Sequence, residues 1–334
     1  MKKALIIFST ILMLAGAAGA LFYQELQRFG GRPLQNNAAG KMIEIPAGEG
    51  LNALAKRLFD GGIVGSPLKF KLLARWRGED KRIQAGEYLL SPSMSPNRIL
   101  DITVSGRVYL HRLTVPEGYT LRQIAANVAR AGLGSEAGFL QAASDPALLK
   151  SYGINAKSFE GYLFPDTYSF AKNATPKKII AAMIDRFNRI FTAAWQARAA
   201  ALGFSTHEIL TLASIIEKET GVPAERPLIS SVFHNRLKKG MRLASDPTVI
   251  YGIEDFDGNL TRRHLKSPQP YNTYYIKGLP PGPIANPGLK AIEATLYPAA
   301  TTYLYFVARK DKTHQFSTNM ADHNRAVRKY QLGR

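Results

Sequence analysis

The sequence predicts an α+β protein with an N-terminal transmembrane helix, a small strand-helix-helix-strand (βααβ) subdomain and a larger mixed α+β domain. Three observations support this class. An uncharged apolar run opens the chain, a strand-turn-helix pattern occurs twice, and amphipathic helices then alternate with loops rich in Pro, Gly, Asn and Tyr. A chain of 334 residues, 46% of them apolar, is long enough for two or three hydrophobic cores.

The first element is the run ALIIFSTILMLAGAAGALFY, residues 4–23, which follows Lys2 and Lys3 and carries no charge. Since a helix needs about 20 apolar residues to cross a bilayer, residues 1–23 are predicted to form a cytoplasmic tip and a single-pass anchor. The positive-inside rule keeps both lysines in the cytoplasm. A cleaved signal peptide is the alternative because residues 18–20 resemble a cleavage site, but the run exceeds the usual ~7 to 15 residues. Both interpretations export the chain.

The composition narrows the choice of partners. The chain has 44 Lys and Arg against 25 Asp and Glu, a net charge of +19, which favours an anionic partner. Export argues against nucleic acid and favours lipid or a cell-wall polymer. The chain has no cysteine and six scattered histidines without a metal-binding spacing, so we expect no disulfide, no metal site and no cofactor.

The segment after the anchor, residues 24–41, is polar and rich in Gly and Asn and is predicted to be a linker. Beyond it, IEIPAGEGLNALAKRL (43–58) and LTVPEGYTLRQIAANV (113–128) share the same order of apolar, Pro, Gly and Leu positions. The match predicts a duplicated strand-turn-helix unit.

The first copy lies in a predicted subdomain at residues 42–108, which continues with a helix, a strand and another helix start. This layout resembles a LysM glycan-binding domain, and a packing or spacer domain without a ligand is the alternative. The second copy (113–185) opens a catalytic domain at residues 109–334. Within it, FEGYLFPDTYSF (159–170) is dense in aromatics, which suggests either a sugar-stacking surface or buried core.

The helix THEILTLASIIEKET, residues 206–220, ends in two glutamates that flank a lysine. Thr206 fits an N-cap, and the apolar positions define one stripe. At ~100° per residue, Lys218 points away from that stripe and from the cleft side, while Glu217 and Glu219 flank the stripe on opposite sides. Most such glutamates are solvated, but a partly covered carboxyl has the raised pKa that a general acid needs.

The helix is terminated by Gly221 and Pro223, which leaves its end beside loops that can form a cleft wall. These loops carry amide, hydroxyl, carboxyl and phenol groups of the kind that bind sugars, and the same residues also fit ordinary turn chemistry. The predicted substrate-binding residues are Asn235, Ser245, Asp246, Thr248, Tyr251, Asn272 and Tyr274.

Several long motifs in register resemble the YceG-like (MltG-type) endolytic murein transglycosylases. They are EGYLFPDTY (160–168), ASIIEKET (213–220), SVFHNRLKKGMRLASDPTVIYG (231–252), YNTYYIKGLPPGPIANPG (271–288) and YLYFVA (303–308). The resemblance covers nearly the whole chain. It implies cleavage of nascent peptidoglycan glycan strands at the inner membrane, outside the cytoplasm, and peptidoglycan synthases as candidate partners. It also implies that Glu219 is the catalytic residue.

The implied reaction is not a hydrolysis. Glu219 would protonate the β-1,4 oxygen between N-acetylmuramic acid (MurNAc) and N-acetylglucosamine (GlcNAc), and its carboxylate would then take the proton of the muramoyl C6 hydroxyl, giving a 1,6-anhydro end. Two alternatives stay open at this point. One is a hydrolytic muramidase that uses Glu217 or Asp246 as a second carboxylate. The other is a non-catalytic wall-binding scaffold for synthases.

Overall fold

The first folded unit comprises the chain up to His111, together with Ala171–Asn173, in a computed structural model that describes residues 2–333. It begins with α1 (Lys2–Gly31), which is long and apolar enough to cross a membrane: an 18-residue stretch of it has a mean hydropathy of 2.3. This helix continues eight residues beyond the predicted end of the anchor, into the segment predicted as linker. The reason is that Leu26, 3% exposed, packs into the core of the unit and Phe29 lies against it.

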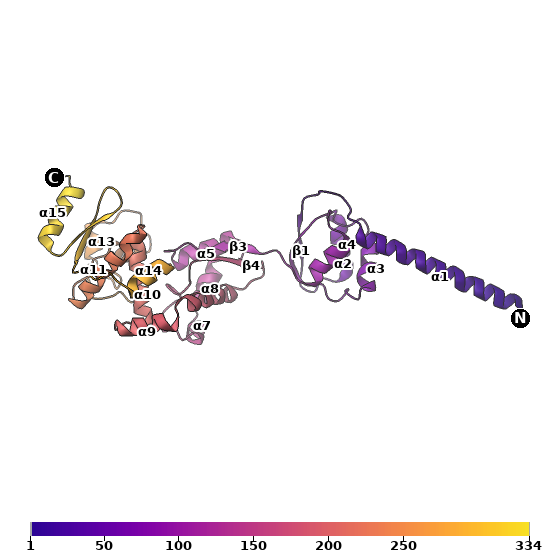
Figure 1. Cartoon of the computed structure of the whole chain (residues 1–334), viewed down its shortest axis with the longest axis horizontal. Coiled ribbons are helices and arrows are strands. Elements are labelled where there is room, and N and C mark those ends of the chain that lie inside the picture. Colours follow the sequence, from indigo (N-terminus) through magenta and orange to yellow (C-terminus); the bar gives the residue numbers. More distant parts are fainter. Residues whose placement is uncertain (1, 334) are drawn as a thin grey trace. The chain divides into compact units, whose positions relative to one another are not determined.

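The rest of this unit has the predicted strand-helix-helix-strand order (Figure 1). Its elements are β1 (Lys41–Ile45), α2 (Leu51–Asp60), α3 (Pro67–Trp76), β2 (Gly86–Leu90) and α4 (Pro96–Val104). The two strands pair antiparallel, with Ile43 opposite Tyr88. Helices α3 and α4 each begin with proline after a serine that caps the first turn, as expected where the first amides need no helical partner.

The second unit comprises Arg112–Phe170 and the chain from Ala174 on. Its first half contains β3 (His111–Thr114), whose first residue closes the first unit, α5 (Leu121–Arg130), α6 (Glu136–Ala143), α7 (Pro146–Ser151), β4 (Thr167–Phe170) and α8 (Pro176–Ile190). Strand β3 pairs with β4. A strand, a turn and a helix follow one another in both β1–α2 and β3–α5. The turns use Gly48 and Gly118 at φ of 79° and 75°, a conformation that favours glycine.

The aromatic segment before β4 is core and not a sugar-stacking surface. Phe159 and Leu163 are fully buried and Tyr162 is 5% exposed. The segment crosses the core as a series of turns, so its side chains fill the space between helices. Gly161 permits this path, because a Cβ atom there would lie 2.3 Å from the ring of Pro283.

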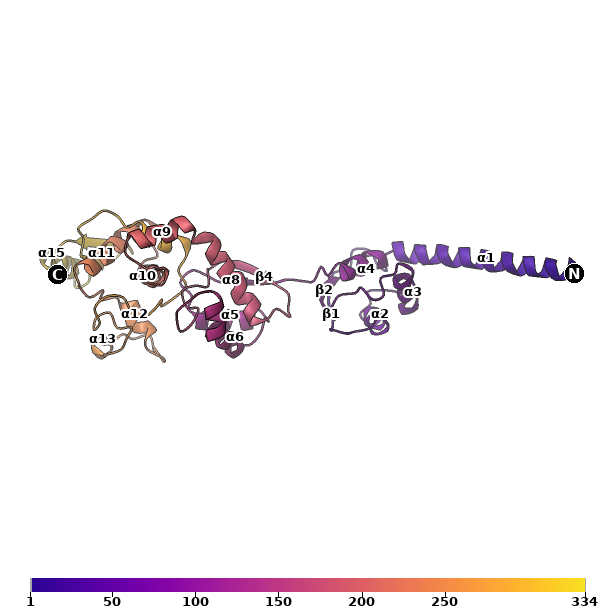
Figure 2. The same ribbon diagram turned by 90° about the horizontal axis from the view of Figure 1, so that it is seen from below.

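The second half of this unit is built around α10 (Thr206–Glu219), which is buried on all sides from Ile209 to Ile216. The other elements are α9 (Ala193–Ala201), a short 3₁₀ turn (Pro223–Glu225), α11 (Arg226–Lys238), α12 (Asp246–Tyr251), α13 (Arg262–Lys266), α14 (Leu289–Leu296), β5 (Tyr305–Ala308), β6 (His314–Ser317) and α15 (Met320–Tyr330). Figure 2 shows α12 and α13 next to each other within this half.

Two sequence predictions for this half can be compared with the structure. The hairpin is confirmed, with β5 and β6 antiparallel and Phe306 opposite Phe316. The N-cap of α10 is Ser205 and not Thr206. Ser205 and Glu208 form a capping box, in which each side chain bonds to the other residue's backbone amide.

Candidate active site

Glu219 is the last residue of α10, and its carboxyl lies at a pocket of about 570 Å³. Side chains from α11, α12, β5, α15 and the loop between α13 and α14 share this pocket, among them Arg236, Asp246, Tyr305, His323 and Tyr274. Gly221 and Pro223 do not line it. Instead, they redirect the chain into α11, which carries Arg236.

Burial raises the pKa of Glu219 to about 7, and the negative charge of Asp246 acts in the same direction. Ser245 opposes this shift because its hydroxyl donates a 2.5 Å hydrogen bond to Oε1 of Glu219. Since the residue keeps partial exposure at the pocket, it can exchange a proton with a bound molecule. A carboxyl with these properties is half protonated near neutral pH, as a general acid requires.

Asp246 and Tyr274 form a second polar pair in the same pocket. The hydroxyl of Tyr274 donates to Oδ1 of Asp246 at 2.6 Å. Burial, together with this acceptor, raises the pKa of Tyr274. The phenol therefore stays protonated and fixes the orientation of the carboxylate.

Arg236 of α11 is a pocket residue that the sequence interpretation missed. It is 9% exposed, and its Nε donates to the carbonyl of Leu304 at 2.7 Å, with a further bond to the carbonyl of Leu243. The guanidinium lies 5.4 Å from the ring centroid of Tyr305. Burial lowers the pKa of Arg236, and its positive charge in turn lowers the pKa of Glu219. The fixed cation lines the same pocket as the carboxyl and favours its ionised form.

The position of Ser245 depends on a constrained backbone. Ala244, just before it, has φ of 49°, a left-handed conformation that is uncommon for a residue with a side chain. Its amide donates to the carbonyl of Thr273 at 3.0 Å, and the amide of Ser245 donates to the Thr273 hydroxyl at 2.9 Å. These bonds hold Ser245, 1% exposed, against Glu219.

Glu217 is neither solvated nor at this pocket. Its Oε1 accepts a bond of 2.9 Å from Arg226, and its Oε2 accepts one of 2.9 Å from the amide of Gly288, at the start of α14. The side chain is 6% exposed. Both oxygens are thus engaged in joining α10 to α11 and α14, which supports a structural role.

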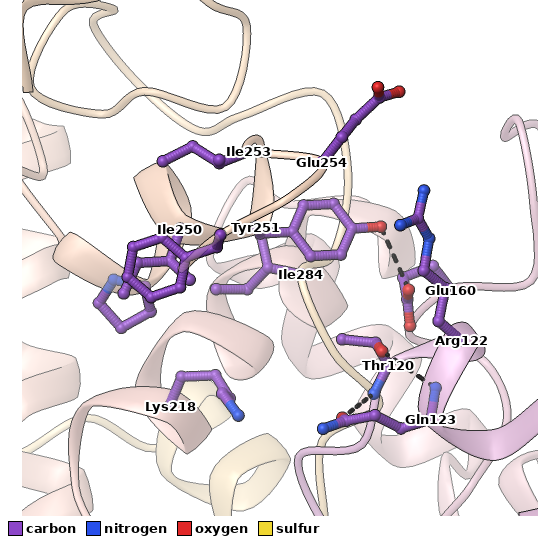
Figure 3. A pocket seen from close by; sticks show the side chains of 12 residues that line it. Thr120, Arg122, Gln123, Glu160, Lys218, Ile250, Tyr251, Ile253, Glu254 and Ile284 are labelled. Atoms are coloured by element: carbon purple, nitrogen blue, oxygen red, sulfur yellow. Dashed lines mark hydrogen bonds between the residues drawn. The ribbon is translucent and has the colours of Figure 1, made fainter. Parts of the chain in front are cut away.

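A second pocket, of about 820 Å³, lies where α5, α10 and α12 meet (Figure 3). Lys218 lines this pocket, although the helix period had placed it away from the cleft side. The predicted substrate-binding residue Tyr251 also lines it, and its hydroxyl donates to Oε2 of Glu160 at 3.1 Å. Figure 3 shows this bond with Arg122 next to the carboxyl.

Glu160 is a second buried carboxyl, 6% exposed, and burial raises its pKa to about 7. It accepts bonds from the amide of Leu121 and from Nδ2 of Asn286 at 2.9 Å. Asn286 itself is fully buried, and its Oδ1 accepts from the amides of Gly161 and Leu163. In the sequence, Asn286 stands out only as part of the motif 271–288, and nothing there indicates this connecting role.

The short helix α12 is held at both ends by these two carboxyls. At its start, the N-cap Ser245 donates to Glu219, and at its end Tyr251 donates to Glu160. α12 therefore separates the two pockets and couples the position of Ser245 to that of Tyr251.

Three other predicted residues make internal bonds. Asn235 donates to the carbonyls of Thr301 and Tyr303, both at 2.9 Å. Thr248, fully buried, bonds to Ser245 and Thr273, and Asn272, fully buried, donates to three carbonyls around the end of α13. These side chains fix the walls of the site, while Asp246, Tyr251 and Tyr274 face its pockets. In residues 2–333, no group of three or more His, Cys, Asp or Glu side chains is arranged to hold a metal ion.

Comparison with known proteins gives consistent matches over most of the chain. The family model described as the YceG-like family matches residues 43–329. The chain is 36% identical to the endolytic murein transglycosylase of Bacillus subtilis, over 86% of this chain and 84% of that one. It is 30% identical to the endolytic murein transglycosylase of Streptococcus pneumoniae D39 over 98% of its length, and spans 65% of that longer relative.

A solved structure agrees with the fold. The 2.6 Å crystal structure of a yceG-like protein from Listeria monocytogenes has a TM-score of 0.61 and 34% sequence identity to this chain. The match covers 87% of this chain and the whole of that one.

Proposed function

Because the chain belongs to the YceG-like family, we propose that it is a lytic transglycosylase that cleaves the glycan strands of peptidoglycan, with Glu219 as its catalytic residue. The observation that carries this proposal is the Glu219 carboxyl, which has its pKa raised to about 7, accepts a hydrogen bond from Ser245 and lines a pocket. The relatives named endolytic murein transglycosylase support the substrate class.

In the proposed reaction, protonated Glu219 donates to the oxygen that links C1 of MurNAc to GlcNAc, and the C1–O bond breaks as positive charge develops at C1. The C6 hydroxyl of the same MurNAc then bonds to C1, and its proton passes to the Glu219 carboxylate. The acid is regenerated, no water is consumed, and the products are a 1,6-anhydro end and a free GlcNAc hydroxyl. The positive charge of Arg236 stabilises the carboxylate form of Glu219, and the negative charge of Asp246 favours its protonated form.

The proposal extends to the location of the enzyme. We place α1 across the inner membrane with Lys2 and Lys3 in the cytoplasm and the two folded units outside it. In this position the enzyme would contact peptidoglycan strands during their synthesis, so that cleavage would end their elongation. Peptidoglycan synthases are therefore the partners to test. We also propose that residues 42–108 bind glycan, because their βααβ order resembles that of a LysM domain.

A hydrolytic muramidase is the second candidate, and Asp246 is the observation that favours it. Asp246 lines the same pocket as Glu219, whereas both oxygens of Glu217 are occupied by Arg226 and Gly288. A hydrolase would use Asp246 as base or nucleophile, so loss of that carboxylate would abolish cleavage.

Mass spectrometry of the products separates these functions. Purified glycan strands digested with the full-length protein should give ends that are one water lighter than reducing ends, and Asp246→Asn should still make them. If the wild type produces reducing ends and Asp246→Asn does not, the protein is a hydrolase. If the wild type leaves the strands intact, the non-catalytic scaffold is the remaining function.

A further inference from the structure

The first unit exposes large apolar side chains close to the point where α1 enters it. Trp76, at the end of α3, is 62% exposed, and Leu68, near the start of the same helix, is 60% exposed. The ring of Trp76 lies 5.3 Å from the ring of Tyr23 on α1, which is itself 46% exposed. Exposed apolar groups gathered in this way indicate a surface with a partner.

The outer face of α3 is both apolar and basic. Phe70, Leu73 and Ala74 face the core of the unit. At ~100° per residue, Leu68 lies on the face of α3 opposite to these three residues, and Trp76 lies about 80° around the helix from Leu68. Arg75 lies beside Leu68 on this face and is exposed, as is Arg28 on α1. This combination suits a lipid headgroup region, where aromatic rings, aliphatic chains and phosphate groups meet.

Two contacts fix the position of α3 along the axis of α1. Leu26 is buried in the core that α3 helps to form, and Nζ of Lys69 bonds to Oε1 of Glu25 at 2.6 Å. Both views of the unit show α3 against the C-terminal end of α1 (Figures 1 and 2). The apolar run of ~20 residues spans ~30 Å, the thickness of the hydrocarbon core. Tyr23, at the end of that run, would then lie at the membrane boundary, and Trp76 would lie at the same depth.

We propose that the outer face of α3 rests in the headgroup layer of the bilayer, with Trp76 and Leu68 at the acyl boundary and Arg75 at the lipid phosphates. The inference rests on the proposed anchoring of α1. It makes the first unit a membrane-seated base instead of a domain on a free tether, since α1 enters its core without a flexible break.

The chain offers a direct probe because it has two tryptophans, Trp76 and Trp195. Trp195 packs against the core of the second unit, next to Phe191. Full-length Trp195→Phe, reconstituted into phosphatidylglycerol-containing vesicles, leaves Trp76 as the reporter. Lipids brominated near the headgroup end of the acyl chain should quench most of its emission, and lipids brominated near the chain end should quench less.

The matched control is full-length Trp76→Phe, in which Trp195 should keep its emission in the same vesicles. Flotation of the vesicles reports anchoring separately. Protein that floats with the vesicles while Trp76 stays unquenched would overturn the membrane-seated face and leave the anchor intact. Protein that fails to float would refute the anchor and with it the inference.

Discussion

Replacing Ser245 by alanine should shift the pH dependence of cleavage upward. The Ser245 hydroxyl donates to Glu219 at 2.5 Å and stabilises the ionised carboxylate. A hydrogen bond to a charged group contributes about 1.5 to 3 kcal/mol, and one pKa unit corresponds to about 1.36 kcal/mol. Ser245→Ala should therefore raise the pKa of Glu219 from about 7 by about one to two units.

The sign follows from the role of the group. A general acid must be protonated in the reactive state, so activity falls as the pH rises through the pKa of Glu219. In the wild type this alkaline limb should lie near pH 7, and in Ser245→Ala it should move to higher pH. The assay is kcat/KM for anhydro-end formation between about pH 5 and about pH 10, a range that includes the alkaline limb of the wild type and that of Ser245→Ala.

The matched control is Ser230→Ala. Ser230 is also a fully buried serine, on α11, and its hydroxyl has no hydrogen-bond partner within residues 2–333. Its replacement should leave the alkaline limb in place. An alkaline limb that stays near pH 7 or moves down in Ser245→Ala would refute the assignment of Glu219 as the acid held by this hydroxyl.

Three further substitutions test neighbouring parts of the site. Asp246→Asn removes a negative charge that raises the pKa of Glu219. The alkaline limb of this variant should therefore move to lower pH. A shift to higher pH in the same series would contradict this electrostatic coupling. Tyr251→Phe removes one bond to the buried Glu160 and should lower the free energy of unfolding by about 1 kcal/mol; thermal unfolding in detergent measures this, with Tyr271→Phe as the control. Arg226→Met leaves Glu217 buried without its cation and should cost about 3 kcal/mol, and an unchanged unfolding midpoint would show that the ion pair is dispensable.

The elements that were predicted correctly depend on local chemistry. The apolar N-terminal run, the Pro and Gly turns at Gly48 and Gly118, and the alternating hairpin each specify their structure within a few residues. The cap of α10 was misplaced by one residue because Ser205 and Thr206 are both good caps and the sequence does not distinguish them. The linker was predicted too long because burial of Leu26 depends on residues of α3, far along the chain.

The site was less predictable because remote segments determine which glutamate is covered. Glu217 and Glu219 are separated by ~200° around α10, and the period alone gives them equal standing. Their roles differ because α14 presents the amide of Gly288 to one carboxyl, while the loop before α12 presents Ser245 to the other. Arg236 and Asn286 act through backbone carbonyls and amides, for which a sequence motif carries no signal.

The most direct test of the central claim is the yield of anhydro-muramoyl ends from Glu219→Gln, with Glu217→Gln as the matched control on the same helix. Glutamine preserves the shape of each side chain and removes its ability to donate a carboxylic proton. We predict that Glu219→Gln binds glycan strands and releases no anhydro ends, while Glu217→Gln still forms them in its folded fraction. Full activity in Glu219→Gln, or its loss in a well-folded Glu217→Gln alone, would contradict the assignment of Glu219 as the general acid.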